Sequence, residues 1–399
     1  MSAAEPVAFP FPPEKGGRIR EVYAERRARC PMGRVRLPSG HDAVLLVRHD
    51  DVAAGLADTR LSHDLTAPGS PRIVTGSSFL DTPDGLLNKD GPGHLRIRRI
   101  VAATFTPRRI ARWAPEIRAI AAELVDDLEK HGSPADLVPG YCFTLPVRVI
   151  CRLLGVPERD LRRFQTWSNA FLLGARMTDS ERLGLVLEFA EYAKDLITAR
   201  RAEPGVDLID ELIAARDGRD ALSEDELLIL VIGLIAAGNE TTSNALGRSI
   251  VTLLSDDRAL WEQLLGHPDL LPAAVDELLR YSMAGNGLLR RAVEDVDLPS
   301  GTVHRGDAVV LALASATFDE QAYPDPDSVL FDREPPAQIA FGAGPHYCLG
   351  AHLAKAELRI GLGMLLERLP GLRLEADPAA LRFTEGEVLS SLVELPVSW

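Results

Sequence analysis

Apolar residues recur every three or four positions along most of the long segments of this chain, which is the period of an amphipathic helix. The spacing predicts helices over Ile110–His131, Arg159–Leu173, Ser180–Ala202, Ser223–Ser255, Leu271–Tyr281 and Ala351–Arg368. Ser223, with Glu226 three residues later, is typical of a capping box at the start of the fourth helix. Gly371 follows the last helix and suits a helix end. The pattern therefore predicts a mainly α protein.

Alternating patterns typical of strands are fewer and occur near the two ends of the chain. They predict a hairpin from Gly33–Leu37 and Asp42–Arg48, and later strands over Val293–Leu298, Ala308–Ala312, Leu381–Thr384 and Leu392–Val397. The stretch Arg60–Asp90 is polar and has no period, so we expect a long loop of the kind that often carries function. No linker, repeat or low-complexity segment interrupts the chain. We expect one large helical domain over residues 1–399 with small peripheral β-sheets.

Charge and composition narrow the possible functions. The 44 Lys and Arg against 58 Asp and Glu give a net charge of −14, which argues against a nucleic-acid binder. The N-terminus lacks the basic and apolar regions of a signal peptide. The longest apolar run, Leu227–Gly238, is shorter than the ~20 residues that span a bilayer. Four cysteines in 399 residues do not form a disulfide framework. We therefore expect a cytoplasmic protein that binds neither membrane nor nucleic acid.

One cysteine lies in an unusual setting, the segment Phe341-Gly-Ala-Gly-Pro-His-Tyr-Cys-Leu-Gly350. Its glycines permit backbone torsions that are closed to other residues. Cys348 comes just before the predicted helix at Ala351, and a helix N-terminus stabilises a thiolate. A thiolate on a loop of small residues is what a thiolate-ligated haem requires. A structural cysteine in a tight turn is the simpler alternative, whereas a zinc site or a redox pair would need further Cys or His residues at short spacing.

A second motif, Ala236-Ala-Gly-Asn-Glu-Thr-Thr242, lies within an apolar helix. A buried acid is costly unless it is satisfied. Gly238 weakens the helix, and Thr241 can bond back to a carbonyl one turn earlier. These features predict a local opening in which a water or O₂ could lie. A capped kink in a core helix is the alternative.

Together the two motifs resemble those of the cytochrome P-450 family, and more narrowly of its soluble bacterial members, over nearly the whole chain and in the same order. The resemblance implies the fold of that family, with Cys348 as the axial ligand of a haem iron. It implies that Phe341 shields the sulfur and that His346 reaches a haem propionate. It further implies that Thr241 hydrogen-bonds dioxygen or a water at the haem, and that Glu240 links that site to solvent protons.

The run Asp90-Gly-Pro-Gly-His-Leu-Arg-Ile-Arg98 resembles a further segment of the family. His94 and Arg98 lie four residues apart on one helix face, so both suit a propionate, and Arg290 is a third candidate. A solvated basic face is the alternative for such a run. Small residues at Gly233, Ala236 and Ala237 would leave space above the haem.

Glu277 and Arg280 match the buried Glu-x-x-Arg pair that supports the haem loop in the family. Two arginines usual downstream are replaced here by Phe318 and Ser328, and Arg333 is the nearest candidate to stand in for them. The substrate would be bound by residues carried over from the family: Gly233, Ala236, Asn286, Leu288, Leu289, Val388 and Leu389.

The resemblance implies a haem-thiolate monooxygenase with haem b, which inserts one atom of O₂ into a C–H or C=C bond of a natural product. Oxidative C–C or C–N coupling on the same haem, without oxygen insertion, is the alternative. A non-catalytic haem or ligand-binding module would need neither Glu240 nor Thr241. Electrons would come from NAD(P)H through a ferredoxin reductase and a ferredoxin to a monomeric enzyme. The ferredoxin would dock on a basic patch of Arg96, Arg99, Arg109, Arg112, Lys355 and Arg359.

Overall fold

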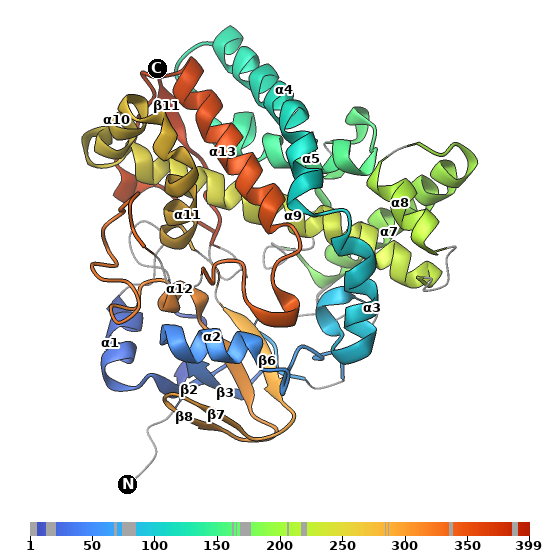
Figure 1. Cartoon of the computed structure of the whole chain (residues 1–399), viewed down its shortest axis with the longest axis vertical. Helices are drawn as coiled ribbons and strands as arrows, with labels where there is room; N and C mark the ends of the chain where they lie inside the picture. Colours follow the sequence, from blue (N-terminus) through green and yellow to red (C-terminus); the bar gives the residue numbers. More distant parts are fainter. Residues whose placement is uncertain are drawn as a thin grey trace. The chain divides into compact units, whose positions relative to one another are not determined.

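The computed structural model describes most of the chain (Figure 1). The described residues are 6–12, 21–67, 70–73, 85–161, 163–164, 166–167, 177–205, 207–216, 222–283, 285, 287–334, 338–384 and 390–399. They form two compact units, between which the chain passes several times. Unit 1 comprises residues 1–95, 283–348 and 384–390, and unit 2 comprises 96–282, 349–383 and 391–399. The expected single domain over residues 1–399 stays a prediction.

A six-stranded sheet forms the centre of unit 1, with strands from both ends of the chain. The order is β1-β2-β3-β9-β6-β4. The strands are β1 (Val7–Ala8), β2 (Met32–Arg36), β3 (Asp42–Leu46), β4 (Leu61–Ser62), β6 (Leu288–Ala292) and β9 (Ala308–Leu311). The expected hairpin is confirmed, because β2 and β3 pair antiparallel. Strand β9 pairs parallel with β3 and antiparallel with β6. A separate two-stranded ribbon joins β7 (Val296–Leu298) and β8 (Gly301–Val303).

Helix α2 (His49–Ala57) packs on this sheet. The helix ends at Ala57, and the N–H of the next residue, Asp58, donates to the carbonyl of Ala54. A Cβ placed on Gly55 would lie 2.8 Å from Leu311 Cδ2 and 3.3 Å from Leu61 Cδ1. The glycine therefore allows close contact between α2 and the sheet. Two further helices, α1 (Glu21–Arg29) and α12 (Leu313–Ala316), also belong to unit 1.

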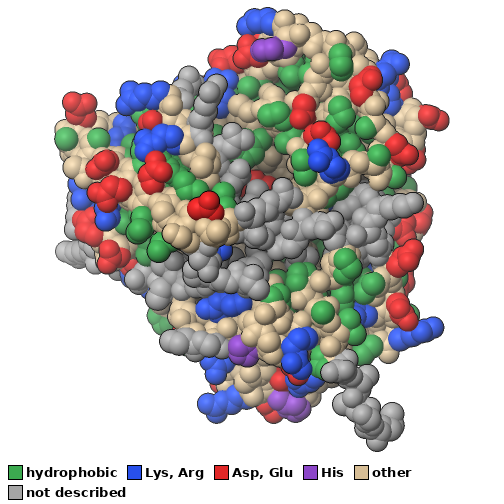
Figure 2. Space-filling view, turned by 180° about the vertical axis from the view of Figure 1, so that it is seen from behind, with side chains coloured by type: hydrophobic (Ala, Val, Ile, Leu, Met, Phe, Trp, Pro, Cys, Tyr) green, Lys and Arg blue, Asp and Glu red, His purple; other side chains and the backbone are tan. Residues whose placement is uncertain are grey.

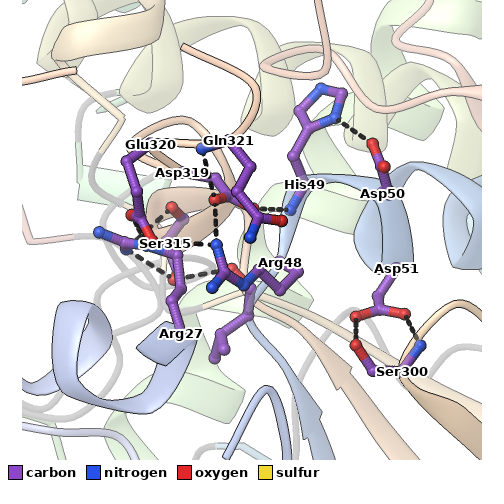
Figure 3. A network of polar contacts seen from close by, with 11 residues as sticks. Arg27, Arg48, His49, Asp50, Asp51, Ser300, Ser315, Asp319, Glu320 and Gln321 are labelled. Carbon is purple, nitrogen blue, oxygen red and sulfur yellow. Dashed lines mark hydrogen bonds and ion pairs between the residues drawn. The ribbon is translucent and has the colours of Figure 1, made fainter. Parts of the chain in front are cut away.

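A polar network joins α1, α12 and the residues around α2 (Figure 3). Arg27 donates to Glu320 at 3.0 Å and to the Ser315 hydroxyl at 3.1 Å. Arg48 donates to Asp319 at 2.7 Å and to Glu320 at 2.9 Å. The Asp319 side chain is buried, so its charge needs these partners.

The same network bears on one of the two arginines missing relative to the family pattern. Phe318 is buried, and it directly precedes Asp319. The guanidinium groups of Arg27 and Arg48 approach this turn from other parts of unit 1. They therefore supply positive charge at a place where the chain has a phenylalanine.

Unit 2 is helical, as the periodicity predicts. Its helices are α4 (Pro107–His131), α5 (Thr144–Leu154), α7 (Asp179–Ala202), α8 (Leu208–Arg216), α9 (Glu224–Leu254), α10 (Ala259–Gly266), α11 (Leu271–Tyr281) and α13 (Ala351–Arg368). Helix α3 (Gly91–Ala102) begins in unit 1 and ends in unit 2. Within unit 2, α9 contacts α5, α7, α10, α11 and α13 (Figure 1). A small sheet of β10 (Arg373–Leu374), β11 (Pro396–Ser398) and β5 (Ala135–Asp136) completes the unit.

The capping box predicted for α9 is confirmed. The Ser223 hydroxyl accepts from the N–H of Glu226, and the Glu226 carboxylate accepts from the N–H of Ser223, both at 3.0 Å. The strand pair expected near the C-terminus is reduced to one isolated bridge, Phe383–Leu392, and the paired residues lie further on, in β11.

Within the described part of the chain, α9 is the helix that is long and apolar enough to cross a membrane by length and composition. Most of this apolar stretch is buried inside the structure, as in the core helix of a globular protein. On the face drawn in Figure 2, the described acidic and basic side chains are interspersed. That face therefore lacks the one-sided positive charge of a nucleic-acid surface.

Candidate functional site

The loop of residues 341–350, the cysteine loop, folds back on itself. The N–H of Cys348 donates to the carbonyl of Phe341 at 2.8 Å, and the N–H of Tyr347 donates to the carbonyl of Gly344 at 3.1 Å. Gly342 and Gly344 have φ angles of +75° and +67°. These are left-handed torsions that favour glycine. The expectation that the glycines shape this loop is confirmed, and Cys348 is exposed at its end.

Close packing against α2 holds the cysteine loop in unit 1. A Cβ placed on Gly344 would lie 2.8 Å from the Cα of Ala57 and 3.1 Å from the carbonyl oxygen of Leu56. Backbone atoms cannot move aside as a flexible side chain can. The loop therefore accepts only glycine at this position, both for its torsion and for its contact.

Gly350 differs from Gly344, because neither its torsion nor its described neighbours require a glycine. It caps α13 with φ of −84°, which any residue can adopt. A Cβ placed there would meet no atom of the described chain within 4 Å. The described chain therefore leaves the backbone two residues after Cys348 accessible, which suits the approach of a flat group.

Three histidines of unit 1 form a stack, here called the imidazole cluster: His63, His346 and His94. The ring centroids of His63 and His346 are 3.3 Å apart, and those of His346 and His94 are 3.9 Å apart. Asp90 lies beside the stack, with Oδ1 3.5 Å from Nε2 of His346. Burial raises the pKa of Asp90, but hydrogen bonds from His346 and Ser62 outweigh it and hold the pKa well below its usual range.

Arg290 on β6 brings a buried positive charge to the same unit. Its side chain is 5 % exposed, and burial lowers its pKa to about 9, against the opposing attraction of Asp90. One of its guanidinium nitrogens donates to the carbonyl of Leu289 at 2.7 Å. A buried arginine is stable when it is paired with an anion. Arg290 and the imidazole cluster together suit a negatively charged group.

Helix α9 carries the second motif without a break. Most of its residues are buried, but Ala237 and Thr241, one turn apart, are exposed, and Gly233 one turn earlier is partly exposed. The Thr241 hydroxyl donates to the carbonyl of Ala237 at 2.8 Å, as predicted. The predicted local opening is absent, because α9 is continuous from Glu224 to Leu254. Ala236 is buried, so the exposed small face is formed by Gly233, Ala237 and Thr241.

Glu240 points away from that face and is 5 % exposed. The hydroxyl of Ser391 donates to its Oε1 at 2.6 Å. Burial raises the pKa of Glu240 above its usual value, and the hydrogen bond from Ser391 partly opposes the shift. The carboxyl is therefore more readily protonated near neutral pH than an exposed glutamate.

The Glu277–Arg280 pair is buried in unit 2. Arg280 donates two hydrogen bonds to Glu277, at 2.8 Å and 2.7 Å, and both side chains are almost fully enclosed. Arg333, expected to stand in for a missing arginine, lies in unit 1. There it donates to carbonyl oxygens of Pro324 and Ser328. It therefore ties its own loop together.

The structure brings the other predicted residues together only in part. Unit 1 holds Cys348, Phe341, His346, His94 and Arg290, together with Leu288 and Leu289 on β6. Unit 2 holds Arg98, Gly233, Ala236, Ala237, Glu240, Thr241, Glu277 and Arg280. Asn286, Val388 and Leu389, expected to line the substrate site, lie outside the described residues.

The expected basic patch is partly neutralised. Arg96 pairs with Glu226 at 2.5 Å, and Lys355 pairs with Asp276 at 2.6 Å. Arg109 likewise pairs with Glu211. The exposed members of the patch are Arg99, Arg112 and Arg359.

Sequence reasoning missed two residues of these sites. His63 lies in a polar stretch without periodicity, and only its place directly after β4 sets it apart. Ser391 gave no signal, because it is 151 positions from Glu240. Both are brought into place by long-range contacts rather than by a local pattern.

The residues fit the haem that the sequence resemblance implies. Among the described residues no group of three or more His, Cys, Asp or Glu could hold a metal ion by itself. A lone exposed thiolate on a tight loop instead suits an iron already held by four ring nitrogens. Arg290 is a buried cation that lacks a carboxylate hydrogen bond in the described contacts, and a propionate would supply one.

Comparisons with known proteins agree with the family resemblance of the sequence. A family model described as Cytochrome P450 matches residues 184–378. Mycinamicin IV hydroxylase/epoxidase of Micromonospora griseorubida is 43 % identical over 401 residues, covering 100 % of both chains. Nocardicin C N-oxygenase of Nocardia uniformis subsp. tsuyamanensis is 39 % identical, again over 100 % of both chains.

Solved structures agree with the sequence relatives. A structure of the mixed-function P450 MycG aligns with a TM-score of 0.88 at 42 % identity, covering 99 % of this chain and 100 % of that one. The mainly helical architecture with small sheets matches that fold. The chain belongs to the cytochrome P450 family, whose members are haem-thiolate oxidoreductases supplied with electrons from outside.

Proposed function

We propose that this protein hydroxylates or epoxidises a natural product of the size and apolar character of a macrolide. The observation that carries the proposal is the acid–alcohol pair of α9, with Thr241 exposed and Glu240 buried against Ser391. Oxygen insertion consumes two protons, and this pair is suited to deliver them. The 43 % identity to mycinamicin IV hydroxylase/epoxidase, over the full length of both chains, supports the substrate class.

The balance of the reaction defines what the protein must do. The haem, when bound, activates dioxygen so that R–H + O₂ + 2 e⁻ + 2 H⁺ gives R–OH + H₂O. The protein must therefore hold the substrate, admit two electrons and deliver two protons. It must also keep other water away from the reacting oxygen.

Two side chains of α9 would have separate roles in proton delivery. The Thr241 hydroxyl donates its hydrogen to the Ala237 carbonyl. Its oxygen can therefore accept a hydrogen bond from a water on the exposed face of α9. That bond orients the water. Glu240, with its raised pKa, gives a proton from the buried side and regains it through the Ser391 hydroxyl. Small residues at Gly233 and Ala237 leave room for the substrate beside them.

The remaining roles are those that the family resemblance implies. Cys348, whose N–H donates to the carbonyl of Phe341, would bind the haem iron through its thiolate, and the Phe341 ring would shield the sulfur. His346, His94, Arg98 and Arg290 bind the propionates. Glu277 and Arg280 stabilise the scaffold. Of the residues predicted to contact the substrate, Ala236 is buried in α9. The others, Gly233, Leu288, Leu289, Asn286, Val388 and Leu389, would contact the substrate.

We further propose haem b as the cofactor, NAD(P)H as the electron source, and a ferredoxin with its reductase as the route. The exposed arginines of unit 2 suit a small acidic donor. The enzyme would act as a monomer in the cytoplasm, without a nucleic-acid or membrane partner.

The ligand assignment has a direct test. Cys348→Ser should abolish the red-shifted Soret band of the reduced carbon-monoxide complex, because the thiolate produces it. Cys30→Ser is the matched control, since Cys30 is the other exposed cysteine of the described chain. A red-shifted band that persisted in Cys348→Ser would assign the ligand elsewhere.

The reaction is tested by screening macrolides for a shift of the resting haem spectrum and then turning over the binders under ¹⁸O₂. Products that gain one ¹⁸O atom support the proposal. Products coupled through a new C–C or C–N bond, without ¹⁸O, would favour the oxidative coupling alternative instead.

A further inference from the structure

His63 directly follows strand β4, one residue beyond its last paired position. In the antiparallel pairing of β4 with β6, Leu61 faces Ala292 and Ser62 faces Arg291. Continued by one residue, this register would bring His63 opposite Arg290, and the charge of Arg290 does act on the His63 ring. Side chains at such positions share one face of the sheet, with Cβ atoms about 5 Å apart. His63 therefore lies beside the buried guanidinium that suits an anion.

The position of His63 is fixed at the backbone. Its N–H donates to Oδ2 of Asp90 at 3.0 Å, and the hydroxyl of Ser62 donates to the same oxygen at 2.5 Å. The ring is then fixed by stacking on His346, with an angle of 15° between the planes. Backbone and ring are both held in place within unit 1.

Parallel stacking also limits what the three rings can bind. The nitrogens of stacked rings lie in parallel planes, so they do not converge on one point as metal ligands must. This agrees with the absence of a metal-binding group among the described residues. Parallel rings can instead present their N–H groups side by side along the edge of the stack.

The electrostatics of the cluster favour an anion. Burial, together with electrostatic repulsion from Arg290 and His346, lowers the pKa of His63 to about 2, against the attraction of Asp90. The ring is therefore neutral at pH 7 and keeps one N–H to donate. An added carboxylate would offset the charge of Arg290 and accept from this N–H.

We propose that His63 donates a hydrogen bond to a haem propionate, beside Arg290. His63 is thus an additional cofactor-binding residue of this chain. The inference does not depend on the proposed reaction, because cofactor binding is measured without substrate or electron donor.

The test measures haem loss from purified holoprotein to an excess of apomyoglobin. His63→Phe keeps an aromatic ring for stacking but has no N–H, whereas His63→Gln keeps a donor but has no ring. His41→Phe is the matched control, since His41 is exposed and its ring forms a hydrogen bond with the Ser39 hydroxyl. We expect His63→Phe to lose haem about tenfold faster than wild type, because a hydrogen bond to a charged group is lost. His63→Gln should stay within about threefold of wild type.

Haem loss from His63→Phe no faster than from His41→Phe would overturn the proposal. If His63→Phe and His63→Gln both lose haem quickly, the propionate bending band in the resonance Raman spectrum distinguishes a lost hydrogen bond from lost packing. A shifted band in His63→Phe supports the hydrogen bond. A band at the wild-type position would mean that His63 only packs against His346.

Discussion

The hydroxyl of Ser391 donates a 2.6 Å hydrogen bond to the buried carboxyl of Glu240, in the middle of α9. The serine comes from the C-terminal stretch of the chain, whereas the acid lies on the longest helix of the described part. Two opposing effects therefore set the pKa of Glu240. Burial raises it, and Ser391 lowers it by favouring the charged form.

Ser391→Ala should raise the pKa of Glu240 further, because only the lowering effect is removed. If Glu240 gives a proton as an acid, coupling falls as pH rises through its pKa. In the variant this fall should move to higher pH. The measurement is product formed per NAD(P)H consumed across a pH series. Ser249→Ala is the control, since Ser249 also lies on α9 but bonds to the Ala245 carbonyl. An unmoved or acid-shifted profile would contradict the prediction.

Thr241→Ala should keep haem and substrate binding but lose coupling. Without the hydroxyl, the water on the exposed face of α9 is not oriented, and proton delivery contributes about 10²-fold or more to such steps. We expect product per NAD(P)H to fall about tenfold while hydrogen peroxide rises. Thr241→Ser, which restores the hydroxyl, should recover most of the product. Unchanged coupling in Thr241→Ala would remove this residue from the proton path.

Glu277→Ala should destabilise unit 2 by about 3–5 kcal/mol, because it leaves the Arg280 charge buried without its carboxylate. Urea unfolding followed by haem absorbance measures the loss. Asp127→Ala is the matched control: Asp127 and Lys130 are also three residues apart on a helix, but both are exposed. The control should unfold like wild type. Similar midpoints for Glu277→Ala and Asp127→Ala would show that burial does not strengthen the pair.

Glu357→Gln should change how stability depends on pH. Glu357 on α13 is 2 % exposed, its Oε2 has no hydrogen-bond partner among the described residues, and burial raises its pKa well above the usual value. The folded pKa is thus higher than the unfolded one. The protonated group stabilises the fold fully below the unfolded pKa, and this stability is lost as pH rises through the folded pKa.

Wild type should therefore lose stability relative to Glu357→Gln as pH rises from acid to neutral, by about 1.4 kcal/mol per pH unit within that window. Thermal melts across a pH series measure the difference. Glu367→Gln is the control, because Glu367 lies on the same helix but is exposed and pairs with Arg118. A constant difference across the series would show that Glu357 titrates normally.

The long helices were predictable because each buries one periodic face. Among the shorter helices, Leu271–Tyr281 was predicted with its observed bounds, but others were not. Helix α2 begins His-Asp-Asp and is held by packing on the sheet through Gly55 rather than by its own pattern. Strand β6 carries Arg290 and Arg291, and these charges hide its alternation. Only pairing with β4 and β9 makes it a strand.

The candidate site likewise combines residues that a local pattern predicts with residues that only distant contacts bring into place. The cysteine loop was predictable because its glycines and Cys348 are consecutive, and their torsions are a local property. The acid–alcohol pair was predictable, but not the unbroken helix around it, because buried helices on several sides hold α9 straight. His63 and Ser391 could not be found, since their partners come from distant parts of the chain.

The parallel pairing of β3 with β9 has a consequence for biosynthesis. Ala43 faces Ala308, so 265 positions (308 − 43) separate two residues that are neighbours in the sheet. At roughly 5–20 residues per second, the ribosome delivers β9 on the order of 13–50 s after β3. The β3 edge of the β2–β3 hairpin therefore stays unpaired until β9 has been synthesised. Arg290 is synthesised shortly before β9, and Cys348 is synthesised after it. Haem capture is therefore a late step in the making of this protein, and a chain arrested before the last quarter of translation has no assembled place for the cofactor.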